Sequence, residues 1–395
     1  MADAKDVRRF TKRQLNRVAR AGFDWNLMIV LAFLLIFGLI MVYSASSYVA
    51  VRDFGNQNHY FTRQLIADII GGAGMIALVF LPYKLYNYNY IFRWAEYGTA
   101  FFLPFLTIPF GIESHNASRW VQIPGTPFNF QPAEASKLFM ILFMASWLYS
   151  LGKKVNENKF FWLSVAAPLP VAGVIYIVTD NLSSAIIVVA ICELMLFIHS
   201  QDYKRFALLI GIVALLVVIA VVVSENTAGS GNFRLGRIYS WLHPEDTMET
   251  TSHQTIQALY AIGNGGIWGK GLGQSVQKIS NLPEPHNDMI FAIIVEELGI
   301  VGAFALIAMF VVLLWRIYVV ARETRETYGF LLTIGVFSHI AVQVVLNIAV
   351  ATNSMPNTGV SLPFISYGGS SVCFLLAEMG IVFGVNRSNQ KDKRK

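Results

Sequence analysis

Long apolar runs without charges dominate this chain of 395 residues. One run begins at Trp25 and ends at Tyr43, and another covers residues 206–223. A helix needs about 20 apolar residues to cross the hydrocarbon core of a bilayer, and these runs come close to that length. Backbone N–H and C=O groups in lipid must be satisfied within the protein, which restricts the chain to helices or a closed barrel. A hydrophobic share of 55% with only 14% charged residues excludes an ordinary soluble domain.

Hydropathy divides the chain into candidate membrane spans. The spans cover residues 25–45, 64–82, 94–110, 135–151, 160–178, 183–199, 206–224, 288–315, 329–351 and 364–385. The sequence therefore predicts an all-α, polytopic integral membrane protein with about ten transmembrane helices. We expect a basic N-terminal segment at 1–24, one transmembrane domain at 25–387 and a basic tail at 388–395. The first span resembles a signal peptide but is longer than an h-region, so we interpret it as an uncleaved helix.

The distribution of positive charge orients these spans. Of the 30 lysine and arginine residues, 22 lie in segments on the side of the N-terminus. Cytoplasmic loops carry such an excess, so both termini are expected in the cytoplasm. The charge is spread over every inner loop without a stripe of interleaved aromatic residues, which argues against nucleic acid as a partner. Cys192 and Cys373 both lie in apolar runs and indicate neither a disulfide framework nor a thiolate metal site.

One outer loop is much longer than the others and covers residues 225–287. Loops of this length are usually functional or disordered. Aromatic and glycine residues occur in patches along it, for example Trp241 and the run from Gly263 to Gly273. We expect short amphipathic or re-entrant helices at the membrane interface.

Eight basic residues remain on or near the outer face, where membrane orientation does not require them. They are Arg52, Arg63, Arg119, Lys137, Arg234, Arg237, Lys270 and Lys278. Contacts with phospholipid head groups would account for them. A site for an anionic, phosphorylated ligand would account for them equally.

Two carboxylates stand where the chain enters the membrane. Glu134 and Lys137, three apart, share a helix face and form either a functional pair or an orienting salt bridge. Partial desolvation of Asp288 would raise its pKa toward that of a useful general base, although Asp is also common at helix N-termini. Glu296 lies about 12 Å farther along the helix, too far for a dyad. Glu134 is the candidate for a second carboxylate.

Small and hydroxyl residues follow the ninth span. Ser366 and Ser370 flank Gly368 and Gly369. Such a segment can turn backbone N–H groups toward an anion or permit close helix packing, and packing is the more general interpretation. The glycines from Gly269 to Gly273 lack the ending of a phosphate-binding loop, and no nucleotide site is predicted there.

These outer segments together carry a family resemblance. The matching motifs are Arg119-Trp120 followed by Phe130-Gln131-Pro132, Glu134 and Lys137; Gly269-Lys270-Gly271-Leu272-Gly273 with Ser275, Gln277, Lys278 and Leu282-Pro283-Glu284; Asp288 and Glu296-Glu297-Leu298-Gly299; and Thr358-Gly359, Leu362-Pro363-Phe364 and Ser366-Tyr367-Gly368-Gly369-Ser370-Ser371. The chain resembles the SEDS family of FtsW, RodA and SpoVE over nearly all of residues 25–387. It looks more like the FtsW and SpoVE branches.

The resemblance implies a peptidoglycan glycosyltransferase of the bacterial plasma membrane that polymerises lipid II, with a role in cell division expected. It also implies a class B penicillin-binding transpeptidase and other divisome proteins as partners. The family's essential aspartate corresponds to Asp288. Around Asp180 this chain departs from the family's Pro-Asp-Leu-Gly-Thr motif, which leaves a role for Asp180 open.

The expected reaction joins a GlcNAc hydroxyl to the MurNAc anomeric carbon with inversion, and Asp288 is the predicted general base. Arg119, Lys137, Arg234 and Arg237 would bind the diphosphate, and Glu134, Lys270, Ser366 and Ser370 complete the predicted substrate-binding set. No cofactor is certain; a divalent cation, Mg²⁺ or Mn²⁺, held through Glu134 is the candidate. Two alternatives remain: a lipid II flippase, and a non-catalytic scaffold that activates a class B penicillin-binding protein.

Overall fold

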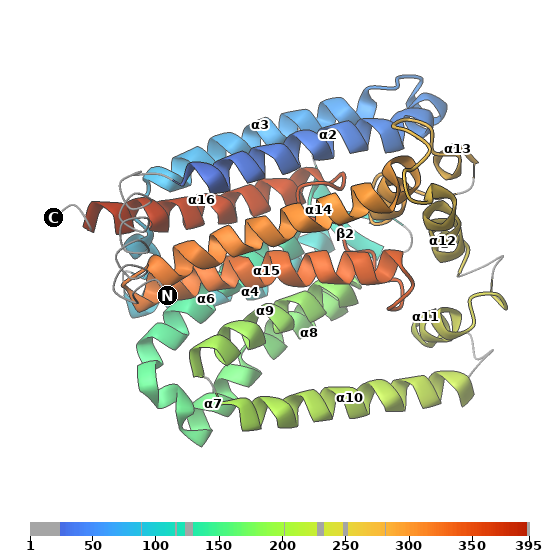
Figure 1. Ribbon diagram of the computed structural model, residues 1–395. Helices are drawn as coiled ribbons and strands as arrows, with labels where there is room; N and C mark the ends of the chain where they lie inside the picture. Colours follow the sequence, from blue (N-terminus) through green and yellow to red (C-terminus); the bar gives the residue numbers. More distant parts are fainter. Residues whose placement is uncertain are drawn as a thin grey trace, which may run out of the picture.

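The computed structural model describes residues 24–87, 89–114, 117–122, 129–200, 202–226, 233–247, 252–280 and 282–392. Most of its helices run side by side in one bundle (Figure 1). Within the described residues, nine helical segments are long and apolar enough to cross a membrane. They are α2 (Trp25–Phe54), α3 (His59–Phe80), α6 (Pro132–Leu151) with η3 (Gly152–Asn156), α7 (Asn158–Ala166) with α8 (Pro168–Thr179), α9 (Leu182–Ser200), α10 (Tyr203–Asn226), α14 (Ile290–Glu323), α15 (Thr327–Ala351) and α16 (Gly369–Asp392). The predicted all-α membrane fold is confirmed.

The predicted span at 94–110 is helical but not continuous. It consists of α4 (Tyr90–Phe102), η2 (Leu103–Leu106) and α5 (Thr107–Phe110), preceded by η1 (Tyr83–Asn87). Pro104 and Pro109 lie within this stretch. Proline has no N–H to donate and its ring clashes with the preceding turn, so the helix changes geometry there.

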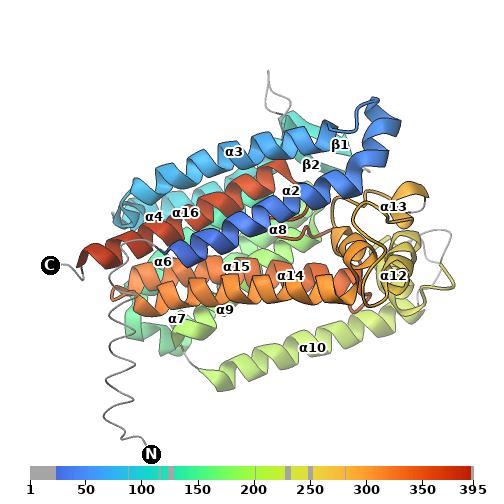
Figure 2. The same cartoon turned by 45° about the horizontal axis from the view of Figure 1, so that its top comes forward.

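The two ends of the bundle differ in character. Helix α2 begins and α16 ends at one end, on the left in Figure 1, whereas α11 (Phe233–Leu242), α12 (His253–Gly265) and α13 (Gln277–Ser280) gather at the other end (Figures 1 and 2). The latter three belong to the long outer loop, so the prediction that this loop contains short helices is confirmed. The predicted basic N-terminal segment lies outside the described residues except for Asp24.

A small antiparallel sheet, which the sequence did not predict, occupies the same outer end. Strands β1 (Gly111–Ser114), β2 (Ala117–Gln122) and β3 (Asn129–Phe130) lie in the order β1-β2-β3. Val121 pairs with Gly111 on one side and with Phe130 on the other. The sheet thereby holds the segment between α5 and α6 next to the start of α6.

Helices α3 and α16 approach each other closely through glycines. A Cβ atom at Gly71 would lie 3.1 Å from the Cα of Cys373, and one at Gly380 would lie 2.8 Å from the carbonyl oxygen of Met75. Small residues permit such backbone approach in membrane bundles, where packing replaces the hydrophobic effect.

Two ionisable side chains meet in the middle of the bundle. His339 of α15 and Glu378 of α16 are completely buried. The Nδ1 atom of His339 lies 2.8 Å from Glu378 Oε2. Placing an ionisable side chain inside a membrane costs free energy, and such side chains usually pair with one another, as His339 and Glu378 do.

Helix α10 stands apart from the other long helices in Figures 1 and 2 and packs chiefly against α11. Its side chains are largely exposed, including Ile210, Leu215 and Val218. These apolar side chains therefore offer lipid-facing surface on nearly all sides of the helix.

Candidate active site at the outer end of the bundle

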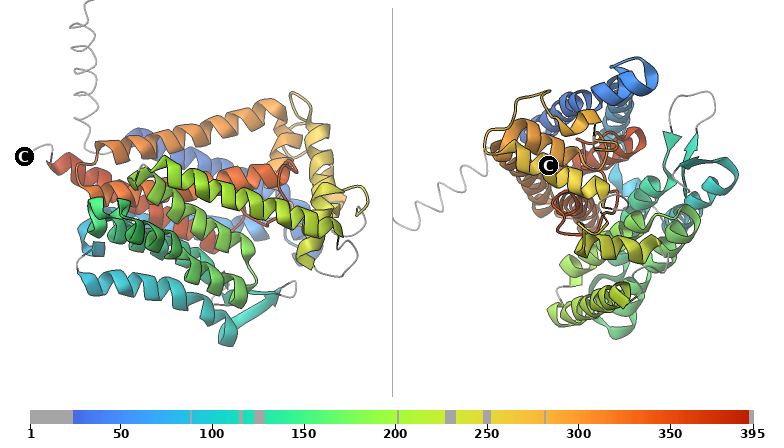
Figure 3. Two further views of the ribbon diagram at one scale, coloured as in Figure 1. Left: turned by 90° about the horizontal axis from the view of Figure 1, so that it is seen from below. Right: turned by 90° about the vertical axis from the view of Figure 1, so that its right-hand side faces the viewer.

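Asp288 lies in the turn that precedes α14 and is half-buried. Asn347, near the outer end of α15, donates from Nδ2 to the backbone oxygens of Asp288 and Val360, each at 2.7 Å. One side-chain amide thus ties the Asp288 turn to the segment that follows α15. The right-hand view of Figure 3, onto this end of the bundle, shows the short yellow helices of the long outer loop in front of the other helices.

The carboxylate of Asp288 has a neutral hydrogen-bond donor beside it. Gln254 of α12 donates from Nε2 to Asp288 Oδ1 at 3.1 Å. A Cβ atom at Gly359 would lie 3.8 Å from the other oxygen, Oδ2. Burial raises the pKa of Asp288 to about 6, and the charge of Glu284 acts in the same direction, while hydrogen bonds from the backbone N–H groups of Asp288 and Met289 and from Gln254 oppose the shift. The predicted desolvation of this carboxylate is therefore present, but Gln254 and Asn347 were not predicted.

Two of the predicted cations donate hydrogen bonds to backbone oxygens of other segments. Arg237 of α11 donates from Nη1 to the backbone oxygen of Asn357 at 3.5 Å. Arg119 on β2 donates from Nη2 to the backbone oxygen of Asp180 at 2.9 Å, and Asp180 has a left-handed φ of 48° at the end of α8. Arg234 also lies in α11, but its side chain lies outside the described part of the structure.

Glu134 and Lys137 form a buried ion pair at the start of α6. Lys137 Nζ lies 2.8 Å from Glu134 Oε1, and the side chains are 1% and 6% exposed, respectively. Ser371 of α16 donates to Glu134 Oε2 at 3.2 Å. The pair therefore joins α6 to α16 as well as linking two residues of one helix.

The predicted serines accept hydrogen bonds from the backbone. The N–H of Leu362 donates to Ser366 Oγ at 2.7 Å, and that of Gln131 donates to Ser370 Oγ at 3.3 Å. Both contacts hold chain segments together, in agreement with the packing interpretation. A role of either serine in substrate binding stays a prediction.

Lys270 and Lys278 each pair with a carboxylate of α14. Lys270 Nζ lies 3.1 Å from Glu296 Oε1, and Lys278 Nζ lies 2.6 Å from Glu297 Oε1. Ser44 of α2 also donates to Glu297, at 2.7 Å. These pairs attach the end of the long outer loop to α14 and α2, and the charge of Lys270 is already compensated.

Helix α12 and the residues after it pack backbone to backbone against α14. A Cβ atom at Gly265 would lie 2.1 Å from the carbonyl oxygen of Val295. Gly299 interrupts α14 with a φ of 69°, and the N–H of Val301 donates to the carbonyl of Ile267 at 3.2 Å. Only glycine tolerates both the approach and the left-handed backbone at low cost.

We expect Gly265→Ala to lower the free energy of unfolding by about 1–3 kcal/mol, because its methyl group would overlap a backbone oxygen. Gly263→Ala is the matched control on the same helix, since no atom lies within 4 Å of the position that its methyl group would take. Thermal unfolding of the two purified variants in the same detergent would compare them. Equal midpoints would contradict the close packing described here.

Comparison with known proteins places this arrangement in a family. The sequence model of the family described as "Cell cycle protein", which covers FtsW, RodA and SpoVE, matches residues 24–391. The chain belongs to this family. It is 35% identical over 376 residues to the probable peptidoglycan glycosyltransferase FtsW of Trichlorobacter lovleyi, covering 93% of each chain. It is 36% identical over 371 residues to stage V sporulation protein E of Bacillus subtilis, covering 92% of this chain and 97% of that protein.

Solved structures of family members share the fold. A chain from a structure described as "Structural coordination of polymerization and crosslinking by a peptidoglycan synthase complex" matches with a TM-score of 0.75 at 26% identity, over 93% of this chain and 98% of that one. The rod shape determining protein RodA of Thermus thermophilus matches with a TM-score of 0.67 at 25% identity, over 94% and 98%. The predicted membership of the SEDS family is confirmed, and the chain is a multi-pass protein of the bacterial plasma membrane.

The predicted divalent-cation site can be compared with the side chains that the structure describes. No group of three or more His, Cys, Asp or Glu side chains that could hold a metal occurs within the described residues. Glu134, the predicted ligand, has a lysine as its partner and is buried with it. A divalent cation held through Glu134 therefore stays a prediction.

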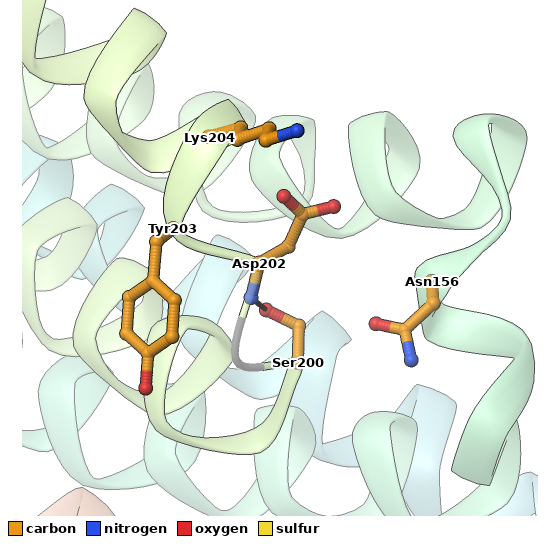
Figure 4. A pocket seen from close by; sticks show the side chains of 5 residues that line it. All are labelled: Asn156, Ser200, Asp202, Tyr203 and Lys204. Carbon is orange, nitrogen blue, oxygen red and sulfur yellow. Dashed lines mark hydrogen bonds between the residues drawn. The ribbon is translucent and has the colours of Figure 1, made fainter.

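A cavity of about 420 Å³ lies at the opposite end of the bundle (Figure 4). It is lined by Asn156, Ser200, Asp202, Tyr203 and Lys204, where α9 connects to α10. Asp202 turns its backbone N–H toward Ser200 Oγ at 3.5 Å. None of the predicted site residues lines this cavity, which separates it from the Asp288 site.

Proposed function

We propose that this chain is a peptidoglycan glycosyltransferase that polymerises lipid II at the outer face of the plasma membrane, in cell division, with Asp288 as general base. The main support is the half-buried Asp288, which lies at the end of the bundle that carries the outer loops and whose pKa is raised to about 6. A base works best when its pKa lies near the operating pH. The relatives named as probable peptidoglycan glycosyltransferases support the same activity.

The reaction is an inverting displacement. The 4-hydroxyl oxygen of an acceptor GlcNAc attacks the anomeric carbon of a donor MurNAc, and Asp288 takes the hydroxyl proton. The bond between that carbon and the phosphate oxygen breaks, and the lipid diphosphate leaves with the electron pair. Negative charge therefore grows on the diphosphate, where preorganised cations stabilise the transition state most.

Two arginines at the outer end supply that stabilisation. Arg237 donates to the backbone oxygen of Asn357 and Arg119 to that of Asp180, and these contacts orient their guanidinium groups. Guanidinium groups bind phosphate oxygens in a bidentate manner, so arginines at this end suit a diphosphate. Lys137 is paired with the buried Glu134, and its proposed contact with the diphosphate would require a rearrangement of that pair.

The substrate's lipid tail needs an apolar surface that reaches the same end. Helix α10 exposes apolar side chains along its length and leads directly toward α11, which carries Arg237. We infer that the tail lies against α10 while the diphosphate meets the arginines. An enzyme arranged in this way takes its substrate from the membrane without extracting it.

A class B penicillin-binding transpeptidase is the proposed partner, together with other divisome proteins. The structural relative from a peptidoglycan synthase complex, described as coordinating polymerization and crosslinking, supports such a pairing. Crosslinking consumes the glycan strands that polymerisation supplies, so the two activities are complementary in chemistry.

The deciding experiment mixes the purified protein and its transpeptidase with lipid II and follows glycan strands by gel electrophoresis. Polymerisation supports the proposal. A flippase would instead move lipid II across vesicles without joining it, and a scaffold would do neither. Transporters place their key charges near the bilayer midplane between repeated halves, whereas Asp288 and the two arginines lie at one end.

The rate of polymerisation is expected to fall below about pH 6, because Asp288 acts only when ionised. The sign follows from burial, which favours the protonated carboxyl and raises its pKa above the ordinary value. Initial rates would be measured between pH 5 and pH 8 with lipid II held well below saturation. The acid limb is the part of this pH–rate profile in which the rate falls as the pH decreases, and its midpoint reports the pKa of the base. A rate that stays constant down to pH 5 would contradict the environment described for Asp288.

A further inference from the structure

Three hydrogen bonds lie end to end beside Asp288 and all run toward it. The backbone N–H of Gly359 donates to Asn357 Oδ1 at 3.2 Å. Asn357 Nδ2 donates to Gln254 Oε1 at 2.9 Å, and Gln254 Nε2 donates to Asp288 Oδ1 at 3.1 Å. The chain of donors joins the segment after α15 to α12 and then to the turn before α14. We call these three hydrogen bonds the donor chain.

The direction of the donor chain is fixed at its first member. A backbone N–H can only donate, so Asn357 must turn its carbonyl oxygen toward Gly359 and its NH₂ toward Gln254. Gln254 then accepts on Oε1 and directs its own NH₂ at Asp288. A side-chain amide without such neighbours can rotate by half a turn and exchange its oxygen and nitrogen. The rotated form of Gln254 would set an oxygen against the carboxylate, and the donor chain excludes it.

We propose that the donor chain positions the Asp288 carboxylate and selects Oδ2 as the oxygen that takes the proton, an inference that rests on the proposed function. Oδ1 already accepts from Gln254, whose NH₂ group cannot accept a hydrogen bond from a protonated Oδ1. Oδ2 faces Gly359, which has no side chain and a left-handed φ of 66°. The acceptor hydroxyl therefore approaches from the Gly359 side. Gln254 and Asn357 are positioning residues.

A neutral amide suits this task better than a cation. Lysine or arginine in the place of Gln254 would favour the ionised carboxylate strongly and weaken it as a base. Among the described side chains, Glu284 raises the pKa of Asp288 by its charge, and Arg237 contacts the backbone oxygen of Asn357. His286 lies two residues before Asp288, and burial lowers its pKa to about 4, so it is neutral at working pH.

The test compares Gln254→Met with Gln257→Met in the full complex with its transpeptidase, using lipid II as substrate. Methionine keeps the length of glutamine but cannot donate. Gln257 lies three residues farther along α12, is half-buried as well and takes no part in the donor chain, which makes it the matched control. Asn357→Leu is the second variant, because it frees the Gln254 amide to rotate without adding charge.

We expect Gln254→Met to lower kcat about tenfold or more with little change in KM, and to move the acid limb up by about one pH unit. The limb moves up because the lost hydrogen bond favoured the ionised carboxylate. Asn357→Leu should shift the limb in the same direction by less. The double variant with Gln254→Met and Asn357→Leu should have the same kcat as Gln254→Met alone, because Gln254→Met already removes the hydrogen bond to Asp288.

A loss of folded protein lowers the rate at every pH but does not move the midpoint of the acid limb. A shifted midpoint therefore distinguishes a positioning role of Gln254 from a purely structural one. If Gln254→Met matches Gln257→Met in rate and limb while Asp288→Asn is inactive, the donor chain is overturned and the proposed function stands. If Gln254→Met does not fold, the limb of Asn357→Leu decides. If Asp288→Asn polymerises normally, the proposed function itself fails.

Discussion

Asp288→Asn is expected to lower the rate of lipid II polymerisation by about 10²- to 10⁴-fold, the usual contribution of a general base. Asparagine has the same size and keeps an oxygen that can accept from Gln254, so the turn before α14 should fold as before. Gel analysis of glycan strands made by the complex would measure the loss.

Glu284→Gln is the control for that experiment. Glu284 lies in the same outer segment, is exposed, and acts on Asp288 only through its charge. We expect it to retain activity, with an acid limb slightly below that of the unchanged protein. Normal polymerisation by a folded Asp288→Asn variant would exclude Asp288 as the base.

Lys137→Met is expected to destabilise the protein by about 3–5 kcal/mol, because it leaves the carboxylate of Glu134 buried without its partner. Replacing both residues, as Glu134→Gln with Lys137→Met, should recover most of the lost stability. The midpoint of thermal unfolding in detergent would report both changes.

Lys84→Met provides the comparison for the buried pair. Lys84 Nζ lies 3.0 Å from Glu326 Oε2, but the lysine side chain is 60% exposed. Exposed pairs contribute at most about 1 kcal/mol, so this variant should unfold almost as the unchanged protein does. A Lys137→Met variant as stable as Lys84→Met would refute the buried pair.

The double variant also separates two roles for the Glu134–Lys137 pair. If it is stable and polymerises lipid II normally, the pair only joins α6 to α16. If it is stable and inactive, the charges themselves serve the reaction, as the predicted substrate-binding role requires.

The membrane fold followed from the sequence because lipid leaves the backbone few choices. Long apolar runs had to become helices, and the positive charge of the inner segments set their direction. The interruption of the helix around Pro104 was not predicted. Hydropathy averages over a window and does not register that a proline interrupts the hydrogen-bond ladder.

The candidate site was predicted only as far as single residues carry a signal. Asp288 stood out because a carboxylate at a membrane boundary is unusual. Gln254 carried no such signal, because its role depends on a contact with a residue 34 positions away. Lys270 was predicted to bind substrate, yet its partner in the structure is Glu296, 26 positions later. Pairing between distant segments is a property of the folded bundle.

The couple formed by His339 and Glu378 bears on how this protein is made. The two residues lie on successive long helices, so neither finds its partner until both helices are in the bilayer. A carboxylate near the centre of a lone helix costs roughly 2.5–3.5 kcal/mol on insertion scales. Helix α16 also ends in a polar stretch that begins with Asn386 and Arg387. Insertion of α15 and α16 with the two side chains paired is therefore expected to cost less free energy than insertion of either helix alone.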